Sequence, residues 1–155
     1  MEIKELGHLV LYVRDLDEST RFYRDVLGWH PIVGDADGGL AFPAMAFNSS
    51  SKRTHHELLL IEVGPHAAPL PGGARVGLYH FGLKVGDSDD ELREALAALR
   101  AGGVTIVGAT DHGMTHSLYI EDPDGNEIEL YIDVPGVDWD DPSLWAEPTL
   151  KPLRL

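Results

Sequence analysis

The chain has 155 residues, of which 43% are hydrophobic and 25% charged, and its formal net charge is −14. These values are typical of a globular protein and argue against a disordered chain. The acidic balance argues against a nucleic acid or an anionic membrane as partner, because both require a basic face. The chain has no cysteine, which excludes disulfides, thiolate metal sites and cysteine nucleophiles. A metal site would have to use His, Asp, Glu and water.

The N-terminal residues lead directly into a strand-like run and lack the apolar core of a signal peptide. No apolar run approaches membrane-spanning length. We therefore expect a cytoplasmic protein that does not enter a membrane.

The first half of the sequence predicts one helix and four strands. Alternating residues predict a strand over 5–13, and Asp15 begins a helix that ends at Gly28. Strands are expected over 29–33, 40–47 and 55–63, separated by Gly-Asp and Ser-rich turns. The predicted order is βαβββ.

The same order returns after a Pro- and Gly-rich segment at 64–76. A strand is expected over 77–85, and Ser88 opens a helix with a capping box. Three strands follow, over 104–107, 115–121 and 127–133, and Asp-Pro-Asp-Gly-Asn at 122–126 predicts the turn between the last two. The remaining residues lack periodicity and are expected to pack over the domain as an extended strap.

We therefore predict a single domain over residues 1–155. Its parts would be module 1 at about 4–64, a linker at 65–76, module 2 at about 77–135 and a C-terminal strap at 136–155.

Two histidines and two glutamates recur at one offset. His8 and His80 are as far apart as Glu57 and Glu129 (80 − 8 and 129 − 57, both 72). This repeat suggests two similar halves that close around one metal ion. The alternation of the strands places both histidines, and Glu129, on the side opposite the apolar residues. We expect His8, His80 and Glu129 to meet on a concave surface. The other nearby acidic residues are interpreted as turn and surface charges: Glu127, Asp124 and Asp133.

The segment SLYIEDPDGNEIELY at 117–131 resembles the terminal strand–turn–strand of the vicinal oxygen chelate superfamily. That superfamily includes glyoxalase I, bleomycin- and fosfomycin-resistance proteins and extradiol dioxygenases, and the resemblance extends over residues 4–135. It implies an α+β fold in which two tandem βαβββ modules form a cup of curved, mainly antiparallel strands around a divalent metal. It also implies a homodimer.

Two shorter segments resemble extradiol (catechol-type) dioxygenases in particular. THHELLL at 54–60 resembles their segment with an active-site histidine that is not a ligand. DHG at 111–113, followed by SLY at 117–119, resembles the stretch that carries a second histidine and a substrate-facing tyrosine.

The resemblance implies a role for each matching residue. The metal ligands would be His8, His80 and Glu129. The catalytic residues would be His56 as acid/base, Tyr119 as hydrogen-bonding residue, and His112, whose spacing to Tyr119 is shorter than in the best-known members.

This set implies a ring-cleaving dioxygenase whose partners are a small aromatic diol and O₂. Two imidazoles and one carboxylate suit non-haem Fe(II), because they leave positions open for a bidentate diol and for O₂. Fe(II) is therefore the expected cofactor, with Mn(II), Ni(II) or Zn(II) as alternatives.

Glu57 leaves a second reaction open. Together with His8, His80 and Glu129 it would form the four-ligand site of a glyoxalase I-like lyase or isomerase, which uses Ni²⁺ or Zn²⁺. A regular strand points only one of His56 and Glu57 inward, and we favour His56, because both short segments resemble the dioxygenases. A drug-binding resistance protein without catalysis is a further alternative.

Overall fold

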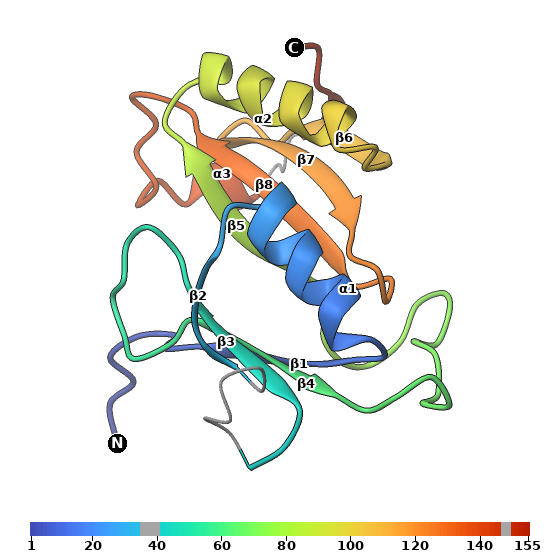
Figure 1. Ribbon diagram of the computed structural model, residues 1–155. Helices are drawn as coiled ribbons and strands as arrows, with labels where there is room; N and C mark the ends of the chain where they lie inside the picture. The colour runs from blue at the N-terminus through green and yellow to red at the C-terminus, as the bar shows by residue number, and fades with distance from the viewer. Residues whose placement is uncertain (35–40, 147–149) are drawn as a thin grey trace. The chain divides into compact units, whose positions relative to one another are not determined.

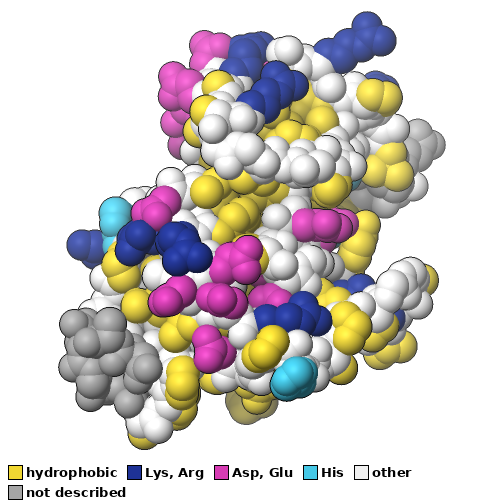
Figure 2. All heavy atoms as spheres, turned by 45° about the vertical axis from the view of Figure 1, so that its right-hand side comes forward, with side chains coloured by type: hydrophobic (Ala, Val, Ile, Leu, Met, Phe, Trp, Pro, Cys, Tyr) yellow, Lys and Arg dark blue, Asp and Glu magenta, His cyan; other side chains and the backbone are white. Residues whose placement is uncertain are grey.

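The computed structural model describes residues 1–34, 41–146 and 150–155. It consists of two compact units, Met1–Leu70 and Pro71–Leu155. No helix in these residues is long and apolar enough to cross a membrane. Figure 2 shows acidic side chains scattered among basic and hydrophobic ones on the face in view.

In the described residues of the first unit there are four strands, one α-helix and a π-helical turn, in the order β1 (Leu9–Val13), α1 (Leu16–Arg21), η1 (Phe22–Val26), β2 (His30–Gly34), β3 (Ala44–Asn48) and β4 (Leu58–Glu62). The strands form one sheet in the order β1-β4-β3-β2. β1 and β4 are parallel, and the other neighbours are antiparallel. The predicted βαβββ order is confirmed for this unit; Leu40, in the third predicted strand, lies outside the described residues.

The first helix begins and ends as its sequence predicts but is not regular throughout. The Asp15 side chain accepts a hydrogen bond from the Glu18 N–H at 2.8 Å and so caps α1. Near its end, the Leu27 N–H bonds to the carbonyl of Phe22, five residues back, which widens the last turn into η1. Gly28, with φ of 73°, ends the helix.

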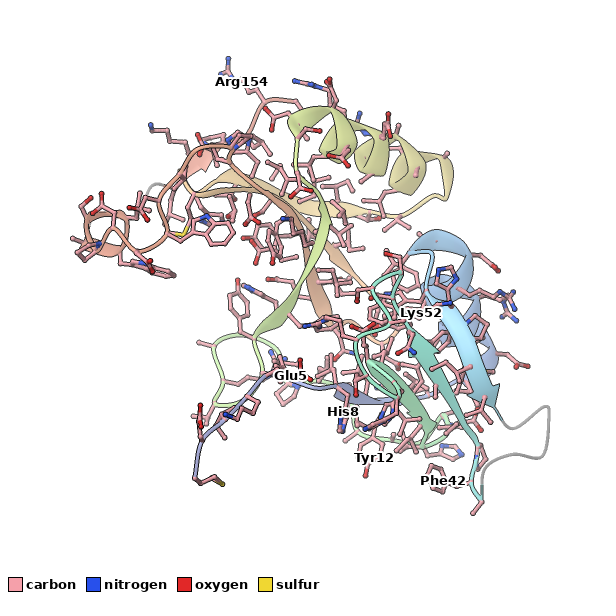
Figure 3. The ribbon with its side chains drawn as sticks, turned by 90° about the vertical axis from the view of Figure 1, so that its left-hand side faces the viewer. Glu5, His8, Tyr12, Phe42, Lys52 and Arg154 are labelled. Carbon is pink, nitrogen blue, oxygen red and sulfur yellow. The ribbon has the colours of Figure 1, made fainter. Side chains whose placement is uncertain are left out.

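The core of the first unit is made by apolar residues of the helical segment and of one side of the sheet: Leu11, Val13, Leu16, Tyr23, Phe47, Leu58 and Leu60. Ala44 and Ala46 are buried on the other side of the sheet. Val10 and Tyr12, which alternate with the buried residues of β1, are exposed. Figure 3 shows the side chains of His8 and Tyr12 on the same side of the N-terminal strand. The predicted division of this strand into two faces is therefore confirmed.

The second unit repeats the order and adds a short helix and a strand: β5 (His80–Gly86), α2 (Asp89–Ala101), β6 (Ile106–Asp111), β7 (Thr115–Glu121), β8 (Glu127–Asp133), α3 (Ser143–Ala146) and β9 (Lys151–Pro152). Its sheet has the order β5-β8-β7-β6-β9. Only β5 and β8 are parallel neighbours. The α+β class with two tandem βαβββ modules of mainly antiparallel strands is confirmed.

Helix α2 covers one face of the second sheet (Figure 1). Ser88 caps it, and the Glu91 carboxylate accepts hydrogen bonds from the Ser88 hydroxyl at 2.7 Å and from the Asp87 N–H at 2.8 Å. Leucines of the helix pack on isoleucines and leucines of the sheet, and the buried set is Leu92, Leu99, Leu118, Ile120, Ile128, Leu130 and Ile132. The other face of the sheet is left to polar residues.

The turn between β7 and β8 has the geometry that its sequence predicts. The buried Asp122 carboxylate accepts hydrogen bonds from the backbone N–H groups of Asp124 at 3.0 Å and Asn126 at 2.8 Å. Gly125 supplies the positive φ of 85°. The turn therefore sets the register in which Tyr119 pairs with Glu129.

Two parts of the second unit differ from the prediction. β6 spans Ile106–Asp111, whereas the sequence predicted a strand over 104–107. A Cβ at Gly108 would lie 3.2 Å from Cδ2 of Tyr119, so the glycine makes room for that ring inside the strand. The tail is also not merely extended, because it contains α3 and pairs with β6 through β9.

Candidate functional site

His80 and Glu129 lie together on the polar face of the second sheet. His80 opens β5, Glu129 lies in the middle of β8, and His80 Nε2 is 3.2 Å from Glu129 Oε2. Gly82 is the register partner of Glu129, and a Cβ there would lie 3.2 Å from Cε1 of Tyr131. The glycine thus keeps this part of the sheet open to the side chains beside it.

Tyr119 and His112 extend this pair into a network. The Tyr119 hydroxyl donates to Glu129 Oε1 at 3.0 Å, and His112 Nε2 lies 2.8 Å from the same hydroxyl. Because the phenol proton is used on Glu129, His112 Nε2 is the donor in the second bond. Burial and the adjacent Glu129 charge raise the pKa of Tyr119, so its hydroxyl stays protonated and able to donate.

Two carboxylates that the sequence suggested were surface charges belong to the surroundings of this network. Glu127 Oε1 lies 3.3 Å from His80 Nδ1, within ion-pair distance but without hydrogen-bond geometry. Asp133 Oδ2 forms an ion pair with Lys84 Nζ at 2.8 Å. Both carboxylates follow the period of two that also places Glu129 on this face, and that period was the signal that could have identified them.

The network lines a pocket of about 560 Å³ in the second unit. The sheet contributes its polar face, and the connection from β6 to β7 contributes His112 and Met114. A third wall comes from the C-terminal segment, through Trp139, Leu144 and Trp145. The sequence predicted that the tail covers the domain but did not identify these residues.

The first unit brings His8 and His56 together at one end of its sheet. His8 directly precedes β1 and His56 lies two residues before β4, and the centroids of their rings are 4.6 Å apart. His56 Nε2 is buried without a hydrogen-bond partner. Burial, followed by the neighbouring His55 and His8, lowers the pKa of His56. His56 is therefore a neutral imidazole at neutral pH.

The Glu57 carboxylate is bound by residues of the loop that precedes β4. Its Oε2 accepts hydrogen bonds from the Ser49 N–H at 2.8 Å and the Ser49 hydroxyl at 2.6 Å. Its Oε1 accepts from the Ser51 hydroxyl at 3.1 Å and from Arg53 Nε at 3.2 Å. A carboxylate has about four acceptor sites, and Glu57 uses all of them within its own loop.

Glu57 is expected to stabilise the fold in a pH-dependent manner. Burial alone would raise its pKa, but the hydrogen bonds from Ser49, Ser51 and Arg53 outweigh burial and hold the pKa below its usual value. The stabilisation is therefore complete above the unfolded-state pKa of about 4.3 and is lost as pH falls through the lower folded-state value.

The Glu57→Gln variant should be less stable than the parent by about 1–3 kcal/mol near neutral pH, because it loses bonds to a charged acceptor. The difference should shrink as the pH is lowered to about 3. Urea unfolding of both proteins across this range measures it, with the exposed Glu94→Gln as control. A difference that does not change with pH would contradict the charged state assigned to Glu57.

The described residues contain no group of three or more His, Asp or Glu arranged to hold a metal ion. His8 belongs to the first unit and His80 and Glu129 to the second, so the set of three ligands stays a prediction. The donors of the second unit nevertheless fit a divalent cation. His80 Nε2 and Glu129 Oε2 face each other at 3.2 Å, and Glu127 stands at the other ring nitrogen, as carboxylates do beside metal-binding histidines.

The sequence of residues 5–130 matches the family model described as the Glyoxalase/Bleomycin resistance protein/Dioxygenase superfamily. The chain belongs to this superfamily. A solved member, the glyoxylase/bleomycin resistance protein/dioxygenase domain from Frankia sp. EAN1pec, is 22% identical with a TM-score of 0.69, covering 85% of this chain and 99% of that one. At this identity the likeness shows the shared superfamily fold alone.

Relatives within the superfamily carry different names. Catechol-2,3-dioxygenase of Bacillus subtilis is 37% identical over 138 residues, which are 89% of this chain but 45% of that protein. Biphenyl-2,3-diol 1,2-dioxygenase 3 of Rhodococcus globerulus is 37% identical over 130 residues, 83% of this chain and 63% of the relative. The chain thus spans about half to two thirds of these dioxygenases. A probable lactoylglutathione lyase of Synechocystis is 30% identical over 128 residues, and the matched region makes up 92% of that protein.

Proposed function

We propose that this chain is a metal-dependent extradiol dioxygenase that cleaves the ring of a catechol-type diol with O₂. The observation that carries the proposal is the orientation of two adjacent residues. Glu57 is fully engaged within its loop, whereas His56 lies against His8 with a free ring nitrogen. The ligand set that we propose is therefore His8, His80 and Glu129, which keeps positions open for a diol and O₂. The 37% identity to a catechol-2,3-dioxygenase supports the same reaction.

The metal that this donor set suits best is Fe(II). When bound, it would supply the redox chemistry that joins O₂ to the diol. Glu127 lies 3.3 Å from His80 Nδ1, the ring nitrogen that would face away from the metal. The remaining steps are proton transfers, and the protein's own side chains determine where each proton is held.

His56 is the proposed general base for the diol. Its lowered pKa keeps the imidazole neutral near pH 7, and its buried Nε2 has no competing partner among the described residues. The same nitrogen, once protonated, can return the proton to the product. Tyr119 stays protonated because its pKa is raised. Its proton lies on the bond to Glu129, so the hydroxyl would donate to a substrate oxygen after turning away from that carboxylate. His112 orients that hydroxyl.

The experiment that tests the reaction is a panel of substituted catechols, incubated with the Fe(II)-loaded protein under air. We expect a yellow ring-cleavage product and O₂ uptake equimolar with the substrate consumed. The hemithioacetal of methylglyoxal and glutathione should remain unchanged in the same protein. Conversion of the hemithioacetal without O₂ uptake would replace the dioxygenase by a lyase, and absence of both conversions would favour a binding protein without catalysis.

A glyoxalase I-like lyase is the second candidate, and one observation favours it. The chain is 30% identical over 128 residues to a probable lactoylglutathione lyase, of which it covers 92%. This reaction would use Ni²⁺ or Zn²⁺ with Glu57 as a fourth ligand. Glu57 would then have to give up its bonds to Ser49, Ser51 and Arg53, for which the structure offers no replacement in the described part of the chain.

A further inference from the structure

The turn between β6 and β7 carries two residues of the pocket lining, His112 and Met114. It is closed by the His112 N–H, which bonds to the carbonyl of Thr115 at 2.9 Å, and Gly113 within it has a φ of 80°. The His112 ring lies 2.8 Å from the Tyr119 hydroxyl. That contact therefore depends on the groups that hold the turn in shape.

Two bonds fix this turn from opposite ends. At one end, the Val134 N–H bonds to the carbonyl of Met114 at 2.9 Å. At the other end, Asp111 Oδ1 accepts a hydrogen bond from the Gly113 N–H at 2.7 Å. An aspartate that accepts from the backbone two residues further on holds a turn in one conformation. Asp111 thus fixes the backbone from which the His112 side chain projects.

His116 lies behind Asp111 and connects it to a helix. The two residues are register partners across β6 and β7, and His116 Nε2 lies 3.7 Å from Asp111 Oδ1, within ion-pair distance. His116 Nδ1 donates to Asp89 Oδ1 at 2.6 Å, because an ionised carboxylate can only accept. Asp89 is the first residue of α2, and the His116 side chain is 20% exposed. The helix therefore holds this ring in a partly shielded site, where such contacts are stronger than at an open surface.

These supporting residues lie outside the substrate pocket. His116 shares a face of β7 with the buried Leu118, under α2, whereas Tyr119 points to the other face. The pocket lining in the described part of the chain includes neither Asp111 nor His116. An effect of either residue on the reaction would have to pass through the turn.

We propose that Asp111 and His116 are positioning residues that hold His112 against the Tyr119 hydroxyl. His112 Nε2 donates to the phenol oxygen and keeps it in place while the phenol proton turns from Glu129 toward the substrate. This inference rests on the proposed function, in which Tyr119 donates to a substrate oxygen, and adds to it a support on the far side of the sheet.

The first test measures steady-state cleavage of catechol by the Fe(II)-loaded protein. Asp111→Ala should lower kcat about tenfold and change KM less than about threefold, because a misplaced donor weakens the transition state more than substrate binding. His116→Phe, which keeps a ring but loses both nitrogens, should lower kcat in the same direction. Asp111→Asn should recover most of the loss, because its amide oxygen can still accept from the Gly113 N–H. His66→Phe, the same substitution at an exposed histidine of the first unit, is the matched control and should have no effect.

A double-mutant cycle shows whether Asp111 acts through His112. In the His112→Ala protein, the further change Asp111→Ala should lower kcat less than about twofold, because residues that act through one contact are not additive. A tenfold loss in both backgrounds would overturn the positioning role, since Asp111 would then act on another group.

The second test needs no catalytic activity. NMR of the ring nitrogens shows which nitrogen of His112 carries the proton, in the full chain loaded with diamagnetic Zn(II). In the wild type this should be Nε2, as donation to Tyr119 requires. In Asp111→Ala and His116→Phe the proton should be divided between the two nitrogens, and in His66→Phe it should stay on Nε2. Unchanged His112 signals in both variants would reject the positioning role even in an active dioxygenase. Changed signals without any ring cleavage by the wild type would keep the positioning role and reject the dioxygenase.

Discussion

Replacing His80 by alanine is expected to remove the bound metal and all ring-cleaving activity. His80 Nε2 and Glu129 Oε2 already face each other at 3.2 Å on one sheet, so the loss of the imidazole leaves the carboxylate without its nearest co-ligand. Even outer partners of metal ligands change metal affinity by about 10–100-fold, and loss of a ligand itself should exceed that range. The measurement is metal content per chain after anaerobic purification, together with O₂ uptake.

Two matched variants show whether the effect belongs to the ligand. Glu127→Gln should weaken metal binding by no more than the range of an outer partner, about 10–100-fold, because Glu127 lies near His80 Nδ1 and is not itself a proposed ligand. Glu94→Gln, on the exposed side of α2, should have no effect. Full metal content in the His80→Ala protein would show that the ligand assignment is wrong.

The second large effect is expected at His56. His56→Ala should lower turnover about 10²-fold or more, the effect of losing a general base, while the metal content stays unchanged. Wild-type activity should fall as pH drops through the lowered pKa of His56, because the protonated ring cannot accept a proton. This acidic limb should be absent from the pH profile of the variant.

The Glu57→Gln variant, measured for metal content and turnover in the same way, distinguishes the dioxygenase site from the lyase site. With Glu57 engaged in its loop, the variant should lose stability but keep its metal and most of its activity. If Glu57→Gln instead loses the metal while His56→Ala stays active, the four-ligand arrangement of a lyase replaces the proposed dioxygenase site.

The parts of the fold that follow from local patterns were predictable. β7 and β8 have the bounds that the sequence predicts, because strict alternation on both sides of Asp122 to Asn126 is joined to a turn with one favourable geometry. The same alternation placed His80 and Glu129 on one face, and the structure brings them together. Period and turn chemistry are properties of neighbouring residues, which a single sequence contains.

The features that depend on distant contacts were not predictable. The common offset suggested equal roles for Glu57 and Glu129, but Glu57 is bound by Ser49, Ser51 and Arg53, whose loop conformation has no periodic signal. The pairing of Lys151 with Asp111 joins segments far apart in the chain. Trp139 and Trp145 lie in the segment that ends in this pairing and line the pocket. The sequence of the tail has no periodic pattern from which their position could have been predicted.

The parallel pairing of first and last strands has a consequence for the order of synthesis. Leu9 is the register partner of Leu58, and Phe81 that of Ile128, so in each unit contacts form between residues about 50 positions apart, which favours slow folding. On the ribosome, β1 has no neighbour until β4 has been made, and β5 has none until β8 emerges. A nascent chain that stalls before Glu127 leaves β5 as an unpaired edge, open to association with other chains.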